Sequence, residues 1–159
     1  MDELIYAIRE KIPGICLRTT LIAGFPGETE KDVNELTDFL QKHRFDRVGI
    51  FHYSHEENTG AHELRDDVPA DVKAARAQRI MEVQQEISYE KNQERVGQMV
   101  QVLIDKKEAG RYIGRTEFDS VEVDNEVILQ TNKKLPIGSF VQAKITRAFD
   151  YDLEAEVVA

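Results

Sequence analysis

The 159-residue chain has the composition of a globular protein, with 41% hydrophobic and 32% charged residues, and its length suits one ordinary domain or two small ones. No apolar run approaches the roughly 20 residues of a membrane span, and the first residues do not open a signal peptide, so we expect a cytoplasmic protein with no membrane role. The net charge of −9 disfavours non-specific nucleic-acid binding, which depends on neutralising phosphates. A basic protein partner is easier to accommodate at this charge.

Cys16 is the only cysteine of the chain, so an internal disulfide is excluded. Its apolar neighbours, Ile15 and Leu17, predict a small core residue rather than a nucleophile or a metal ligand. An iron–sulfur cluster needs about three or four thiolates, so this chain alone cannot hold one. A single unpaired cysteine also fits a reducing, cytoplasmic setting.

The first half of the chain alternates between helical and strand patterns. Residues 2–10 predict a short helix, and residues 15–24 predict a strand that becomes continuously apolar, as in a sheet covered on both faces. A helical period follows, with Thr29 as the predicted N-cap and Asp32 completing a capping box. Residues 45–53 predict a second strand. A strand–helix–strand unit of this length predicts two parallel strands.

The second half begins with a long predicted helix from Pro69 to about Val96. After Gly97 the apolar period becomes two, and five short strands are predicted near residues 99–104, 112–116, 127–131, 141–146 and 153–157. Five such strands in about 60 residues predict a small antiparallel barrel. The predicted fold class is therefore α/β followed by all-β, with domains at residues 1–95 and 96–159.

A parallel sheet of two strands is not a stable domain by itself. One interpretation is that a second copy completes the sheet by dimerisation. The other is that the chain is the tail of a longer protein whose earlier strand–helix units are missing. We favour the second interpretation.

Ligands of parallel α/β folds bind at the carboxyl ends of the strands, where this chain has the loop 24–29 and the residues that follow position 53. The strand period places Ile22 and Gly24 on one face of the sheet. Phe51 and Tyr53, at the end of the second strand, could form a wall for a planar ligand, or they could belong to the core. The loop 24–29 could equally be a tight turn without a ligand, since it matches neither a Walker loop nor a dinucleotide fingerprint.

Several other patterns predict neither a metal site nor a catalytic site. The spacing of His52, His55 and His62 matches no compact zinc pattern, and the neighbouring acids suggest a solvated loop. No nucleophile–base arrangement is visible, and paired acids at positions 66 and 67 suggest loop solvation. We therefore predict no catalytic and no metal-binding residue in the chain.

Five segments carry a family resemblance, in this order: "LRTTLIAGFPGETEKD", "FDRVGIFHYSHEENTGA", "VPADVKAARAQRIMEVQQEIS", "GRTEFDSVEVDNEV" and "ITRAFDYDLEAE". Together they resemble the C-terminal part of the RimO methylthiotransferases over nearly the whole chain. The resemblance implies a radical S-adenosylmethionine enzyme that adds a methylthio group to the β-carbon of an aspartate in small-subunit ribosomal protein twelve. It also implies a fold: the last strands of a partial (β/α)6 barrel, a long linking helix, and a five-stranded TRAM barrel.

The same resemblance assigns cofactors and site residues. Ile22, Gly24, Phe51 and Tyr53 match positions that border the adenine of S-adenosylmethionine. Members carry two 4Fe–4S clusters, but the cysteines that bind them are absent here and Cys16 is not one of them. We therefore expect the full-length parent to be an enzyme, and this fragment to be an inactive monomer that binds no cofactor.

The alternative within the same superfamily is a MiaB-like enzyme, which methylthiolates an adenosine of transfer RNA and whose TRAM domain would bind RNA. The acidic segment "FDSVEVDNEV" works against phosphate contacts. It favours a basic ribosomal protein as the partner, with weak or no RNA binding.

Overall fold

The computed structural model describes residues 1–121 and 123–158. The chain divides into two compact units, Met1–Ile87 and Ser88–Ala159, and the dividing point lies inside helix α3 (Ala70–Glu94). The domain limits 1–95 and 96–159 stay a prediction. Glu122 of the acidic segment and Ala159 of the predicted second domain lie outside the described residues.

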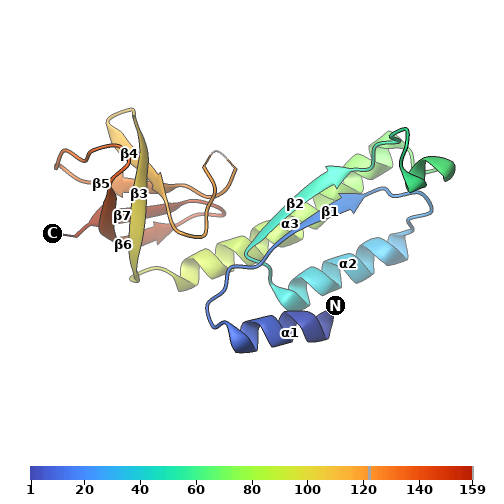
Figure 1. Ribbon diagram of the computed structural model, residues 1–159, viewed down its shortest axis with the longest axis horizontal. Helices are drawn as coiled ribbons and strands as arrows, with labels where there is room; N and C mark the ends of the chain where they lie inside the picture. The colour runs from blue at the N-terminus through green and yellow to red at the C-terminus, as the bar shows by residue number, and fades with distance from the viewer. Residues whose placement is uncertain (122, 159) are drawn as a thin grey trace. The chain divides into compact units, whose positions relative to one another are not determined.

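The first unit contains a two-stranded parallel sheet. Its elements are α1 (Asp2–Lys11), β1 (Arg18–Ala23), α2 (Glu30–His43), β2 (Arg47–His52), the 3-10 helix η1 (Gly60–Glu63) and the first part of α3 (Figure 1). The register runs from Arg18 opposite Arg47 to Ala23 opposite His52. The predicted strand–helix–strand unit and its parallel pairing are confirmed, although both strands are shorter at each end than predicted.

Helix α2 begins with the capping box that the sequence predicts. The Asp32 N–H donates to Thr29 Oγ1 at 3.4 Å, and the Thr29 N–H donates back to Asp32 Oδ2 at 2.8 Å. Hydrogen bonds from the hydroxyl and the N–H of Thr29 hold the pKa of Asp32 below its ordinary value of 3.8. The cap fixes where the chain leaves the loop after β1 and turns into a helix.

The core of this unit lies on one face of the sheet. Its buried apolar residues are Ile5, Ala23, Val33, Leu40, Phe45, Ala77, Ile80 and Ile87. On the other face Ile22 is 51% exposed and Phe51 is 64% exposed. The continuously apolar strand pattern predicted cover on both faces, but no element of residues 1–87 covers this one.

Asp2 joins α1 to α2, because its carboxylate pairs with Lys42 and lies 2.9 Å from His43 Nε2. These hydrogen bonds, first from Lys42 and then from His43, lower the pKa of Asp2 from 3.8 to about 2. A lowered carboxyl pKa stabilises the folded state above the ordinary value, and this contribution is lost as the pH falls toward the folded-state pKa. We expect Asp2→Asn to be less stable than the wild type above about pH 4, with the difference disappearing near pH 2.

Urea unfolding at a series of pH values tests this expectation. Glu3→Gln removes a neighbouring acid in the first turn of the same helix and is the control. A stability difference for Asp2→Asn that is independent of pH across this range would contradict the ion-pair explanation.

The second unit is a closed barrel. Its strands are β3 (Met99–Glu108), β4 (Arg111–Arg115), β5 (Val127–Gln130), β6 (Phe140–Ala148) and β7 (Leu153–Val157), in the order β3-β4-β5-β7-β6. The predicted five-stranded barrel is confirmed. The predicted all-antiparallel pairing is wrong for one pair, since β5 and β7 are parallel. The reason is that β6 pairs with β3, so the β6–β7 hairpin places β7 beside β5 in the same direction.

The barrel interior is filled by apolar side chains that alternate along the strands. The buried residues are Val102, Ile104, Tyr112, Val127, Leu129, Ala143, Ile145, Ala148, Leu153 and Ala155. The last turns of α3 belong to this unit, and there Asn92 Nδ2 donates to the carbonyls of Phe149, Asp150 and Tyr151 at 2.9–3.4 Å. Across residues 1–121 and 123–158, no helix has the length and apolar character needed to cross a membrane.

Candidate functional site

The exposed face of the two-stranded sheet carries an apolar pair at its carboxyl end. Ile22 of β1 and Phe51 of β2 are cross-strand partners, so their side chains lie on the same face. Two residues earlier in each strand, and on the same face, Thr20 pairs with Gly49. Because Gly49 has no side chain, the sheet surface is open beside the apolar pair. The structure therefore brings together two of the four residues that the resemblance assigns to a ligand.

The loop after β1 is fixed by backbone hydrogen bonds. Gly24 has a φ of +77° and its N–H donates to Glu28 Oε1 at 2.9 Å. The Gly27 N–H donates to Asp67 Oδ1 at 2.8 Å. Asp67 is exposed, as the sequence predicts for a loop acid, but it also holds the loop after β1 through this hydrogen bond. A side chain at Gly24 would meet Lys73, whose Cγ lies 2.2 Å from the position of a Cβ.

Tyr53 lies apart from the face that carries Phe51. Strand β2 ends at His52, and beyond it the Tyr53 side chain is buried, with its ring 5.3 Å from that of Phe25 in an edge-on arrangement. The Tyr53 hydroxyl donates to the carbonyl of Ala61 at 3.1 Å. Tyr53 and Gly24 therefore support the strand ends from the covered side.

Lys73 of α3 is a buried cation that the sequence analysis missed. Its Nζ donates to both carboxylate oxygens of Asp66, at 2.7 and 2.8 Å, and to the carbonyl of Tyr53 at 3.3 Å. It also lies 4.9 Å from the centre of the Tyr53 ring. A signal was available, because Lys73 is four residues before Ala77 and seven before Ile80, on the buried stripe of the helix.

Arg76, one turn along α3, holds the loop after β1. Its Nη1 donates to the carbonyl of Glu28 at 3.0 Å and to Glu28 Oε1 at 2.9 Å, while its Nε donates to Glu30 Oε1 at 2.8 Å. Burial works against the charge of Arg76, but the hydrogen bonds to Glu30 and Glu28 raise its pKa. The two cations of α3 thus brace the ends of both strands.

The histidines of the loop after β2 form a ring contact. His55 and His62 lie with ring centres 4.4 Å apart, and His55 Nδ1 is 3.2 Å from the Tyr53 hydroxyl. Within the described part of the chain, no group of three or more histidine, cysteine, aspartate or glutamate side chains could hold a metal ion.

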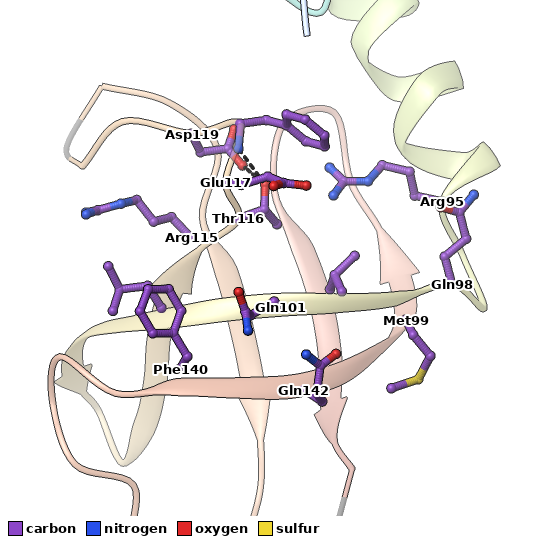
Figure 2. Close-up of a pocket in the computed structure, with 13 residues that line it drawn as sticks. Arg95, Gln98, Met99, Gln101, Arg115, Thr116, Glu117, Asp119, Phe140 and Gln142 are labelled. Atoms are coloured by element: carbon purple, nitrogen blue, oxygen red, sulfur yellow. Dashed lines mark hydrogen bonds between the residues drawn. The ribbon is translucent and has the colours of Figure 1, made fainter. Parts of the chain in front are cut away.

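The barrel carries a groove of about 600 Å³ on the outer face of β3 and β6. Figure 2 shows Phe140, Gln101 and Gln142 along these two neighbouring strands, with Met99 at one end. Gln101 is directly opposite Gln142 in the β3–β6 register. Phe140 is 64% exposed and Met99 is 51% exposed, so the groove offers apolar surface to solvent.

The other wall of the groove is polar. Arg115 Nη1 donates to Asp105 Oδ1 at 2.8 Å, and Thr116 Oγ1 donates to Asp119 Oδ2 at 2.6 Å. Glu117, next to Thr116 in the sequence, also lines this wall and is exposed. Among residues 1–121 and 123–158, no cation pairs with Glu117.

A TRAM domain model matches residues 96–158, the segment that contains the barrel. A protein of Flavobacterium psychrophilum is 52% identical over 155 residues, which are 97% of this chain and 36% of that protein. A protein of Cytophaga hutchinsonii is 48% identical over 158 residues (99% and 36%), and one of Chlorobium limicola is 49% identical over 157 residues (98% and 37%). All three are named ribosomal protein uS12 methylthiotransferase RimO.

The chain belongs to the RimO family. It spans about a third of the length of these RimO relatives, and the match to them runs through both compact units. The family resemblance predicted from the five sequence segments is confirmed, and so is the TRAM domain. The candidate sites of this RimO segment are the exposed apolar pair of Ile22 and Phe51 and the β3–β6 groove of the TRAM barrel.

Proposed function

We propose that the full-length protein is a radical S-adenosylmethionine methylthiotransferase that adds a methylthio group to the β-carbon of an aspartate in ribosomal protein uS12. The observation that carries this proposal is the identity of 52% over 97% of the chain to a protein named as a uS12 methylthiotransferase. The reaction is cytoplasmic, where the ribosome is assembled, and the protein acts as a monomer.

Ile22 and Phe51 suit one wall of an adenine pocket. Both are apolar, both are exposed, and they are cross-strand partners at the carboxyl end of a parallel sheet, where α/β folds bind ligands. A flat aromatic ring such as Phe51 can stack on a base. Bound S-adenosylmethionine would supply the methyl group and the radical chemistry. The residues of this chain would orient its adenine and shield it from water.

In this proposal Gly24 and Tyr53 support the pocket wall indirectly. Gly24 does so through the backbone of the loop after β1, and Tyr53 through its packing at the end of β2. The loop from Gly24 to Glu28 is braced by Arg76, and the end of β2 is braced by Lys73. Cys16 is the only thiol of the chain, so the two 4Fe–4S clusters of the family would depend on residues outside 1–159. The segment 1–159 alone is therefore proposed to be inactive and to bind neither cluster.

The TRAM domain is proposed to dock the substrate protein. Ribosomal proteins carry basic surfaces because they bind RNA phosphates, and this chain has a net charge of −9. Opposite charges speed the encounter of two proteins and favour the correct partner.

Mass spectrometry of uS12 after incubation with the purified, cluster-loaded full-length protein tests the activity. We expect one methylthio group on a single aspartate of uS12, dependent on S-adenosylmethionine. A product found on transfer RNA adenosine, with uS12 unchanged, would replace this function with the MiaB-like alternative.

Phe51→Ala in the full-length protein tests the assigned pocket wall. Loss of an aromatic stacking partner costs about 1–3 kcal/mol, which corresponds to a roughly 5- to 150-fold higher Kd for S-adenosylmethionine. Tyr89→Ala removes an aromatic side chain that is 44% exposed on α3 and is the control. Equal affinities of the two variants for S-adenosylmethionine would remove Phe51 from the pocket.

A further inference from the structure

The β3–β6 groove lies on a barrel that leaves no strand edge open. Each of the five strands is paired on both sides in the closed order β3-β4-β5-β7-β6. A partner therefore cannot add a strand through its main chain, which is a common way of binding an extended peptide. Any partner of this face must be recognised by the side chains that stand on it.

We propose that this groove docks an extended basic segment of the substrate protein, with one apolar side chain of that segment held against Phe140 and Leu103. This inference rests on the proposed function, because it takes uS12 as the substrate. It adds the surface that binds the substrate and the chemical character of the segment that is bound.

The apolar part of the groove provides the anchor. Phe140 and Leu103 are cross-strand partners, and together they form an aromatic and aliphatic surface at one end of the groove. Phe140 is more exposed than any other phenylalanine of the barrel unit described here, at 64%. Exposed aromatic residues beside a cavity are the usual anchors of protein interfaces.

The middle of the groove suits a peptide backbone. Gln101 and Gln142 face each other across β3 and β6, and Figure 2 shows both side chains on the groove face. Each primary amide has donors and an acceptor, which match the N–H and C=O groups of an extended chain. Neutral amides also avoid the desolvation cost of a buried charge.

The polar wall favours a basic partner over a nucleic acid. Two acidic residues, Glu117 and Asp119, line the groove on this wall, and Glu117 is exposed. Of the two arginines that line the groove, Arg115 is already paired with Asp105, and the Arg95 guanidinium lies 5.8 Å from the centre of the Phe118 ring. A phosphate backbone would lie against Glu117, whereas a lysine or arginine side chain would be attracted to it.

Two substitutions in the full-length protein test the docking site through its Kd for purified uS12. Phe140→Thr removes the anchor while keeping a residue that suits a strand, and we expect the Kd to rise about tenfold. Glu117→Lys reverses the charge of the wall, and we expect a rise of about threefold or more that shrinks as salt is added. The Kd for S-adenosylmethionine should be unchanged in both variants.

Two control variants match these changes. Ile137→Thr removes an apolar side chain that is 57% exposed but does not line the groove. Glu10→Lys makes the same change of net charge on the exposed surface of α1. Unfolding midpoints of all four variants verify that each is folded, and a pair of smaller changes, Phe140→Leu and Glu117→Gln, replaces any variant that is not.

The outcomes separate the two proposals. If the full-length protein leaves uS12 unmodified, the proposed function fails and the docking proposal fails with it. If uS12 is modified but the groove variants bind it as tightly as the control variants do, only the docking proposal is overturned. Tighter binding of transfer RNA than of uS12, weakened by Phe140→Thr, would also overturn it by assigning the groove to RNA.

Discussion

Gly24→Ala is expected to lower the free energy of unfolding of the chain by about 2–5 kcal/mol. Two costs add at this position. The φ of +77° is a left-handed conformation that disfavours any side chain, at about 1–2 kcal/mol. The new Cβ would also lie 2.2 Å from Lys73 Cγ and 2.9 Å from Lys73 Cβ, so the buried stem of the lysine would have to move, at about 1–3 kcal/mol.

Gly27→Ala in the same loop separates these two costs. Gly27 also has a positive φ, of +81°, but the position of its Cβ has open space around it. We expect Gly27→Ala to lose only the conformational part, about 1–2 kcal/mol. Urea unfolding of both variants measures the difference, and equal losses would show that the contact with Lys73 does not restrict the loop.

Arg76→Met is expected to destabilise the chain by about 3 kcal/mol. The side chains of Arg76 and Glu28 are only 11% and 10% exposed, so removing the arginine leaves a nearly buried carboxylate without its cation. Glu28 also accepts the Gly24 N–H, and the loop after β1 should therefore loosen. Faster amide hydrogen exchange at Gly24 would report this local effect separately from global unfolding.

Arg79→Met is the matched control for Arg76→Met. Arg79 is on the same helix and pairs with Glu30 at 3.3 Å, but these two side chains are 42% and 64% exposed. An exposed ion pair contributes about 0–1 kcal/mol. A loss as large for Arg79→Met as for Arg76→Met would mean that burial of the Arg76–Glu28 pair is not what makes it important.

Local sequence signals were sufficient for much of the first unit. The capping box of Thr29 and Asp32 depends on residues three positions apart, and the structure contains it. The parallel pairing of β1 and β2 follows from the length of the connection between them. Both features are determined by nearby residues, so the sequence alone could predict them.

The pairing of the barrel strands depends on residues that are far apart in sequence. The alternating pattern of Leu153, Ala155 and Val157 predicts a strand with one buried face, but it does not say which neighbour that strand pairs with. The β6–β3 pairing joins residues about 40 positions apart, and this pairing decides that β7 runs parallel to β5. Strand number was therefore predictable, while strand direction was not.

The site residues that lie inside regular strands were predictable, because the two-residue period of a strand determines which face each side chain occupies. Ile22 and Phe51 lie on one face because both are within regular strands. Tyr53 follows the last residue of β2, so the period no longer determines its direction, and it turns to the covered side. Lys73 was missed because lysines are seldom buried, and its partners come from a loop and from the end of β2.

The place of β7 in the barrel has a consequence for synthesis of the protein on the ribosome. β7 lies between β5 and β6, yet it is the last of the five strands to be translated. Until it has emerged, β5 and β6 each present an unpaired edge, and such edges pair readily with other chains. The barrel therefore closes only after β7 has emerged, and we expect a change in the β6–β7 turn, which Asn92 holds, to reduce the yield of soluble protein more than the stability of the finished fold.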